Sequence, residues 1–242
     1  EECTLSKEDF IKKFKVKEQI YLLFFYFYIM KLYVISGLGA DFKVLEKLKF
    51  PEHLEVVFLD WLLPERGETF HHYVERMAEK MDDSEPFCLL GYSFGGIMVQ
   101  EIDKIKPAEK IVILGSIKSD REKSRFIKVG EITRIPKYLP ENIFTEKSAL
   151  AYSFIRRFFD PKNPKLMEYF TVRDPYYLKW SIEKIAEWKF KENPKVIQIL
   201  ADKDIVFPIK YSKPNYVIQN GTHLFPATKH REVSELLSTI FV

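Results

Sequence analysis

The stretch FCLLGYSFGGI, residues 87–97 of this 242-residue chain, does most to decide the fold. Its first four residues are apolar and predict a buried strand, and the pattern that follows, as far as Ile105, predicts a helix. Between the two, Gly91 and Gly95 flank Ser93 and leave room for a close crossing of strand and helix. A serine on such a sharp turn takes a strained backbone conformation that exposes its Oγ. The stretch therefore predicts a reactive hydroxyl at the edge of a sheet.

Similar elements recur along the rest of the chain. Short apolar runs predict further strands at residues 32–35, 56–59, 111–114, 196–200 and 216–218. Because these runs do not alternate with polar residues, the strands are expected to be buried on both faces, as in a parallel sheet. Helical patterns lie between them at residues 42–48, 73–81, 97–105 and 233–240, with Thr69 as a possible cap. This alternation predicts the α/β class, with a doubly wound, mostly parallel sheet and a ligand site at its carboxyl edge.

Residues 117–192 break the alternation. They contain five prolines and no convincing buried strand, but they include helical patches at 149–159 and 176–188. A structureless loop of this length is improbable in a compact domain. We therefore predict a helical cap over residues 117–192, inserted into an α/β core made of residues 30–116 and 193–242.

Residues 1–29 need a separate interpretation. An apolar, aromatic-rich run at 20–30 follows a polar segment, and it is shorter than the roughly 20 residues that a membrane-spanning helix requires. Met30 stands directly before the first predicted strand, so we expect the native domain to start there and residues 1–29 to be read-through from upstream. A surface helix or a weak membrane anchor is the alternative.

Composition limits the location and the partners. Hydrophobic residues make up 46% and charged residues 30%, which is ordinary for a globular protein, and the net charge of +3 is too small to indicate nucleic-acid binding. Cys3 and Cys88 form no disulfide framework, which favours a reducing compartment. We expect a cytoplasmic protein without stable membrane insertion, with membrane association or export through residues 20–30 as the alternative. The oligomeric state is left open.

The pattern Gly91-x-Ser93-x-Gly95, set between strand and helix, resembles the nucleophile turn of the α/β-hydrolase superfamily. The resemblance covers about residues 30–242 and includes the helical insertion after the strand at 111–114. It implies a small serine esterase, lipase or acyl hydrolase with Ser93 as nucleophile. It also implies an acid after the penultimate strand and a histidine base after the last one.

Each of these two positions holds a suitable residue. His223, in the turn after the strand at 216–218, is expected as the base, and Asp204, four residues before Pro208, as the acid that orients it. Asp202 is the alternative acid, although its spacing makes it more suitable for bracing the turn, and Asp120 is a more distant one. The remaining histidines fit worse by position: His53, His71, His72 and His230.

Two backbone NH groups are expected to form an oxyanion hole. Phe94 supplies one at the start of the helix, and Leu38, in the glycine-containing loop after the first strand, supplies the other. Many family members carry His-Gly in that loop, where this chain has Ser36-Gly37.

The same loop allows a rival interpretation. Gly37-x-Gly39, with Asp60 at the end of the next strand, matches part of a dinucleotide-binding fingerprint. Phe42 replaces its third glycine, however, and the sequence contains no Tyr-x-x-x-Lys pair, so a hydrolase without a cofactor is favoured.

The predicted cap carries the positive charge of the chain. Residues 117–192 hold 17 Lys and Arg against 11 Asp and Glu. Arg156 and Arg157 could steer an anionic acyl substrate or thioester carrier, and Tyr92 and Trp180 are further candidate substrate contacts. Alternatively, the aromatic residues form the core of the cap and the basic ones its solvated face.

The sequence thus predicts a serine hydrolase that acts on a small-molecule ester, thioester or related acyl bond. No metal is expected, because the chain has no H-x-H, HExxH or cysteine cluster. Alternatives within the same fold are acyl transfer, perhydrolysis, C–C bond hydrolysis or binding without catalysis.

Overall fold

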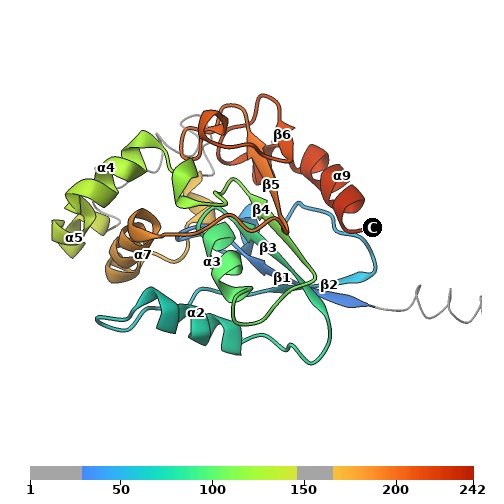
Figure 1. Cartoon of the computed structure of the whole chain (residues 1–242), viewed down its shortest axis with the longest axis horizontal. Coiled ribbons are helices and arrows are strands. Elements are labelled where there is room, and N and C mark those ends of the chain that lie inside the picture. The colour runs from blue at the N-terminus through green and yellow to red at the C-terminus, as the bar shows by residue number, and fades with distance from the viewer. Residues whose placement is uncertain (1–28, 146–165) are drawn as a thin grey trace, which may run out of the picture.

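A computed structural model describes residues 29–145 and 166–242 (Figure 1). Within them, six strands form one parallel sheet in the order β2-β1-β3-β4-β5-β6. The strands are β1 (Met30–Ile35), β2 (Leu54–Phe58), β3 (Phe87–Tyr92), β4 (Lys110–Leu114), β5 (Val196–Ala201) and β6 (Tyr216–Ile218). The predicted α/β class and parallel sheet are confirmed, and each strand overlaps an apolar run of the sequence.

Helices cover both faces of the sheet. Tyr33 and Ile35 of β1 belong to a buried cluster with α2 (Phe70–Glu79) and α3 (Phe94–Ile102). Leu32 and Val34 belong to a second cluster with α8 (Phe225–Thr228) and α9 (His230–Ile240). Figure 1 shows α2 and α9 on opposite sides of the sheet. Because neighbouring residues of a strand point to opposite faces, both sets must be apolar, which explains the unbroken runs.

Helix boundaries differ from the predicted ones in places. Thr69 caps α2 as expected, since its side chain accepts a hydrogen bond from the His72 backbone at 3.2 Å. Residues 42–48 contain only a short 3₁₀ helix, η1 (Phe42–Val44). The helix after Ser93 begins at Phe94 and ends at Ile102, three residues before its predicted end. In a longer helix the ring of Pro107 would clash with the carbonyl of Asp103, four residues earlier.

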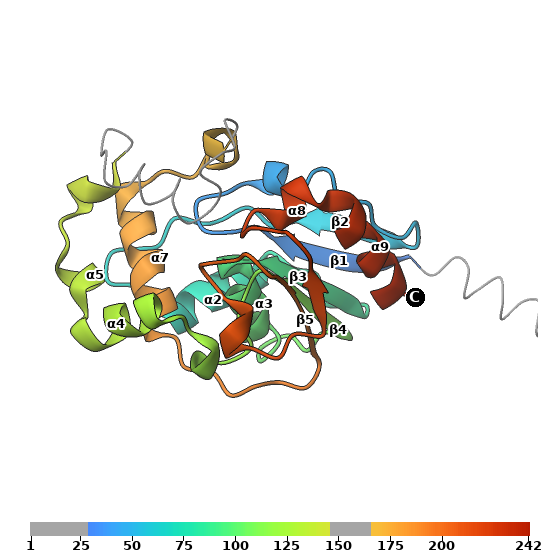
Figure 2. The ribbon, with the colours of Figure 1, turned by 90° about the horizontal axis from the view of Figure 1, so that it is seen from above.

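The named elements described between β4 and β5 are all helices. They are η2 (Asp120–Glu122), α4 (Arg125–Thr133), α5 (Ile135–Tyr138), η3 (Glu141–Phe144), η4 (Leu166–Tyr169) and α7 (Pro175–Glu187). Figure 2 shows α4, α5 and α7 grouped at one end of the molecule, away from the C-terminus. The predicted helix at 149–159 lies outside the described residues, and the division into core and cap remains a prediction.

None of the helices in residues 29–145 and 166–242 is long and apolar enough to cross a bilayer. Residues 1–28 lie outside the described part, so the interpretation of the N-terminal segment remains a prediction.

Candidate active site

Ser93 occupies a strained turn between β3 and α3. Its backbone has φ 54° and ψ −117°, a combination that non-glycine residues rarely adopt. The flanking glycines make the turn possible: a Cβ on Gly91 would lie 2.3 Å from the Gly95 carbonyl oxygen, and a Cβ on Gly95 would lie 2.3 Å from that of Ile35. The local sequence thus forces the serine to the carboxyl end of β3.

Gly95→Ala is expected to prevent stable folding or to lower Tm by more than about 10 °C. The added methyl group would press on backbone oxygens that cannot move without breaking β1, and clashes of this kind cost about 4 kcal/mol or more. Thermal unfolding measures the effect. Gly130→Ala in α4 is the control, because its Cβ would meet only Pro136 at 3.8 Å and its Tm should be unchanged or higher. Equal Tm values for the two variants would contradict this account.

The residues expected as nucleophile, base and acid lie together at this edge. His223 Nε2 is 2.9 Å from Ser93 Oγ, and His223 Nδ1 is 2.7 Å from Asp204 Oδ2. All three residues are buried. Since an ionised carboxylate can only accept, Nδ1 carries the proton and Nε2 presents its lone pair to the serine hydroxyl. This geometry allows the imidazole to remove the hydroxyl proton.

The structure separates the two aspartates that the sequence left open. Asp204 Oδ1 accepts hydrogen bonds from the backbone of Val206 and Phe207 at 2.8 and 3.0 Å, which fixes the carboxylate while Oδ2 faces His223. Asp202 instead accepts from the Gly221 backbone at 3.2 Å and so ties the turn before His223 to the loop after β5. The arrangement fits Asp204 as the partner of the imidazole and Asp202 as a brace.

Tyr92 corrects one expectation. It was a candidate substrate contact, but its side chain is buried and its hydroxyl donates a hydrogen bond to the His223 carbonyl oxygen at 3.0 Å. Burial raises the pKa of Tyr92 well above its ordinary value, so the phenol remains a donor. A residue next to the nucleophile in a strand points into the sheet's packed face, and here it supports the loop that carries His223.

Tyr92→Phe is expected to destabilise the fold by about 1–3 kcal/mol, because it leaves the buried His223 carbonyl without this donor, and also to lower kcat. Urea unfolding and steady-state kinetics measure the two effects. Tyr73→Phe is the matched control, since the Tyr73 hydroxyl donates to the Leu62 carbonyl at 2.7 Å away from the site. It should lose stability without losing kcat; an equal loss of kcat in both variants would argue against a specific role for Tyr92.

The loop after β1 runs beside the serine. A Cβ on Gly37 would lie 3.3 Å from Ser93 Cβ, and Leu38 lines the same cavity as Ser93. Phe94 is the first residue of α3, and the NH groups of a first helical turn have no partner within the helix. The two segments expected to supply the oxyanion donors therefore both adjoin Ser93, and the oxyanion hole itself remains a prediction.

Three residues missed by sequence reasoning hold this loop in place. Trp61 Nε1 donates to the Gly37 carbonyl at 3.0 Å, Val172 N donates to the Gly39 carbonyl at 3.0 Å, and the Tyr177 hydroxyl accepts from Gly39 N at 3.4 Å. Gly39 has φ 71°, which glycine adopts readily. No local pattern marks these partners, because they lie 24 to 138 positions away from the loop.

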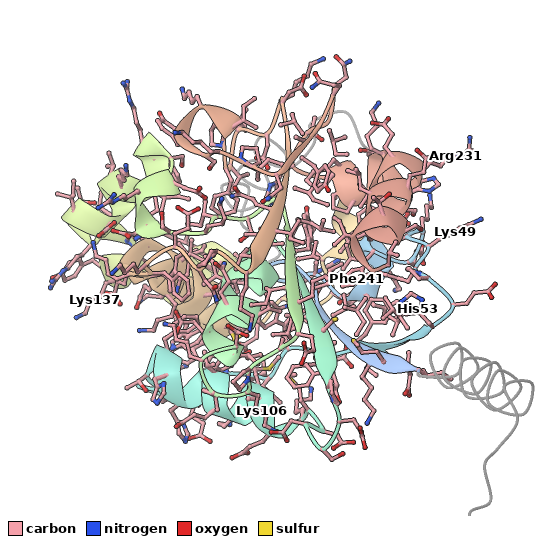
Figure 3. All side chains as sticks on the ribbon, turned by 45° about the vertical axis from the view of Figure 1, so that its right-hand side comes forward. Lys49, His53, Lys106, Lys137, Arg231 and Phe241 are labelled. Atoms are coloured by element: carbon pink, nitrogen blue, oxygen red, sulfur yellow. The ribbon has the colours of Figure 1, made fainter. Side chains whose placement is uncertain are left out.

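The alternative histidines and Asp120 lie elsewhere. His53 is exposed just before β2 (Figure 3), at the amino edge of the sheet, whereas Ser93 lies at the carboxyl edge. The His53 carbonyl accepts a hydrogen bond from Met30 N at 2.9 Å. His71 and His72 are exposed on α2, and His230 begins α9. Asp120 is part of η2.

A cavity of about 440 Å³ extends from Ser93 toward the helical segment. Its walls come from the loop after β1, the loop after β5, and α4, α5, η3 and α7. No Lys, Arg, Asp or Glu is among the described residues that line it. Arg156 and Arg157 lie outside the described residues, so substrate steering by them remains a prediction.

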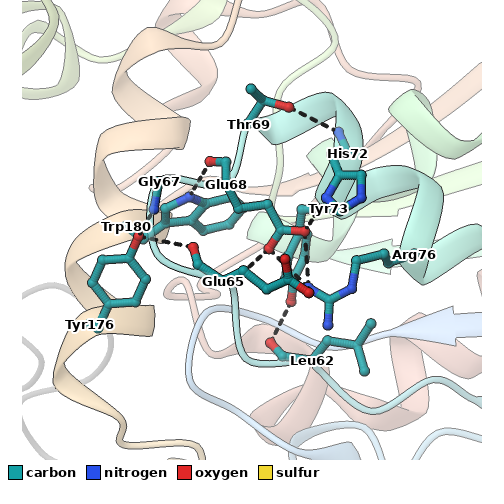
Figure 4. A network of polar contacts seen from close by, with 10 residues as sticks. All are labelled: Leu62, Glu65, Gly67, Glu68, Thr69, His72, Tyr73, Arg76, Tyr176 and Trp180. Carbon is teal, nitrogen blue, oxygen red and sulfur yellow. Dashed lines mark hydrogen bonds and ion pairs between the residues drawn. The ribbon is translucent and has the colours of Figure 1, made fainter.

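Trp180 does not line this cavity and corrects a second expectation. Its Nε1 donates to the Glu68 carbonyl at 3.0 Å, and its ring lies 4.6 Å from that of Tyr73 (Figure 4). In the same network, the Tyr176 hydroxyl accepts from Gly67 N at 2.9 Å. Trp180 therefore attaches α7 to the segment before α2, which is a structural role.

The same network contains an acidic cluster that no sequence motif indicated. Glu65, Glu68 and His72 bring possible metal-ligating atoms within 4.8 Å of one another. The Arg76 guanidinium, however, donates to both Glu68 oxygens at 2.9 and 3.0 Å (Figure 4). Burial raises the pKa of Glu68, but the hydrogen bonds from Arg76 and the Glu65 backbone outweigh it and lower the pKa overall. The cluster is thus explained by an arginine–carboxylate interaction.

Comparisons with known proteins agree with this architecture. No family model matches the sequence, and no curated protein matches it. The structure is similar to that of a hydrolase from Pseudomonas aeruginosa PA01, with a TM-score of 0.66, 14% identity and coverage of 88% of this chain and 89% of the other. It is also similar to a lipase-esterase related protein from Clostridium acetobutylicum ATCC 824, with a TM-score of 0.60, 19% identity and coverage of 87% of this chain and 93% of the other. A third similar structure is an N-acyl homoserine lactonase complexed with N-hexanoyl homoserine, with a TM-score of 0.59, 16% identity and coverage of 87% of this chain and 89% of the other. The chain has the α/β-hydrolase fold.

Proposed function

We propose that this protein is a serine hydrolase that cleaves an ester, thioester or related acyl bond. The observation that carries the proposal is the buried chain of hydrogen bonds from Asp204 through His223 to Ser93, with the serine on a strained turn. A serine hydroxyl is a weak nucleophile, and this arrangement supplies the base and the group that orients it.

The proposed reaction proceeds through an acyl-enzyme. Ser93 Oγ attacks the carbonyl carbon while its proton passes to His223 Nε2, and Asp204 stabilises the imidazolium that forms. The backbone NH groups of Leu38 and Phe94 stabilise the negative charge on the carbonyl oxygen. His223 then gives the proton to the leaving group, and water, activated by the same imidazole, releases the acyl group from Ser93.

Similar structures lend support at the level of the reaction class. Their names include lipase, esterase, hydrolase and lactonase, and a lactone is itself a cyclic ester.

The alternatives gain less support from the described residues. A dinucleotide site needs the N-terminus of a long helix after the first glycine-rich loop, and here only the three-residue η1 follows it. Acyl transfer, perhydrolysis and C–C hydrolysis would use the same serine, and binding without catalysis would not need the ordered imidazole.

Labelling with a fluorophosphonate probe tests the proposal, because such probes react covalently with activated serines. We expect modification of Ser93, located by peptide mass spectrometry, and hydrolysis of a short p-nitrophenyl ester. Absence of labelling in folded protein, together with absence of ester hydrolysis, would overturn it.

A further inference from the structure

The cavity next to Ser93 is chemically uniform. Its described lining consists of apolar side chains, Gly130 and three hydroxyl residues, namely Ser93, Ser124 and Thr133. Ser124 Oγ caps α4 by accepting from Ile127 N at 3.5 Å, and Thr133 Oγ1 donates to the Val129 carbonyl at 2.7 Å. Two of the three hydroxyls thus already have partners within α4. A charged group placed here would lose its water without gaining a partner, whereas an apolar chain would be favoured.

The position of the cavity relative to the hydrogen-bonded residues indicates which half of a substrate it takes. The leaving group must face His223, which gives it a proton, and His223 is not among the described residues that line the cavity. Leu38, from the expected oxyanion loop, and Ser93 both line it. The part of the substrate that stays bonded to Ser93 therefore points into the cavity.

Gly130 is an unusual residue for its place in this wall. It lies inside helix α4, where glycine is less favourable than alanine, and its φ is not positive. No close contact explains it, because an added Cβ would meet only Pro136 atoms at 3.8 and 4.0 Å, and Pro136 also lines the cavity. The missing side chain leaves part of the cavity open.

We propose that the cavity binds an uncharged, apolar acyl chain, and that the absence of a side chain at Gly130 allows a longer chain to be accepted. This rests on the proposed serine hydrolase function. Each methylene transferred from water into an apolar site favours binding by up to about fourfold. The chain-length dependence of the reaction is therefore a direct measure of the cavity.

The experiment uses the full chain and a series of p-nitrophenyl esters from acetyl to decanoyl. Each ester is kept below the concentration at which it aggregates in water. The ratio of kcat/KM for octanoyl to that for acetyl should be at least tenfold. Gly130→Phe should lower this ratio at least tenfold, because the ring fills the cavity. Ile132→Phe is the matched control on the same helix: Ile132 is 81% exposed and does not line the cavity, so its ratio should equal that of the unaltered protein.

A binding readout keeps this proposal separate from the proposed function. The uncharged fluorophore N-phenyl-1-naphthylamine should bind the unaltered protein and Ile132→Phe equally, and Gly130→Phe at least tenfold more weakly. Gly130→Leu, with a smaller side chain, replaces Gly130→Phe if the latter fails to fold. Labelling of Ser93 with a flat chain-length profile, or a profile indifferent to Gly130→Phe, would overturn the acyl-chain proposal and leave the hydrolase function standing. If Ser93 is not labelled and no ester is cleaved, the hydrolase function fails. Fluorophore binding that Gly130→Phe weakens would then still support the apolar site, whereas binding that Gly130→Phe leaves unchanged would overturn it.

Discussion

Ser93→Ala is expected to lower kcat for ester hydrolysis by about 10⁴- to 10⁶-fold while the protein stays folded. The substitution removes only Oγ, the atom that lies 2.9 Å from His223 Nε2. His223→Ala should have a similar effect, because the hydroxyl then has no base within reach. The double variant should be scarcely worse than either single variant, since residues that act in one proton transfer are strongly non-additive.

Steady-state kinetics, with Tm as the check on folding, measure these losses. Some hydrolysis above the rate in water should remain in each variant, because the backbone donors near Leu38 and Phe94 are unaffected. A loss of less than about tenfold in folded Ser93→Ala would rule out the serine as nucleophile. Losses that multiply in the double variant would mean that the two side chains act in separate steps.

Asp204→Asn is expected to lower kcat by about 10⁴-fold, the second large effect. An amide in place of the carboxylate can donate to Nδ1, which would favour the tautomer whose Nε2 carries the proton and cannot act as a base. The bonds from Val206 and Phe207 can still be accepted by the amide oxygen, so the loop should keep its shape.

Asp202→Asn is the matched control, two positions away in the same loop. Its side chain accepts from the Gly221 backbone, which an amide oxygen can also do, so kcat should change by less than about tenfold. The comparison decides between the two acids that the sequence left open. A larger loss at Asp202 than at Asp204 would reverse the assignment.

The fold and the proximity of Ser93, Asp204 and His223 could be predicted from the sequence, and both predictions depend on the properties of a buried parallel sheet. Strands buried on both faces leave unbroken apolar runs, and parallel strands bring their carboxyl ends to one edge, so residues that directly follow β3, β5 and β6 must lie near one another. Ser93, Asp204 and His223 each follow a strand in this way. The glycines around Ser93 add a steric requirement that is visible in the residue types alone.

The errors concern contacts between segments far apart in the sequence. An aromatic residue near a predicted site can face either the ligand or the core, and residue type does not decide between them. The Tyr92 hydroxyl donates to the His223 carbonyl, and Trp180 Nε1 donates to the Glu68 carbonyl just before α2. A separate error is the start of α3, which was predicted at Ile97 but lies at Phe94. Gly95 and Gly96 lie in this first turn, and glycine is unfavourable within helices.

The loop at 37–41 has a consequence for how the protein is made. It is synthesised before all of its partners, because the donors and acceptors that hold it come from positions 61, 169, 172 and 177. Contacts of such sequence separation form only after much of the chain has been ordered. A nascent polypeptide that stops short of residue 177 can already contain β1 to β4 and the serine turn, but its loop at 37–41 would still lack the contact with Tyr177. The loop therefore reaches its final arrangement only after residue 177 has been synthesised.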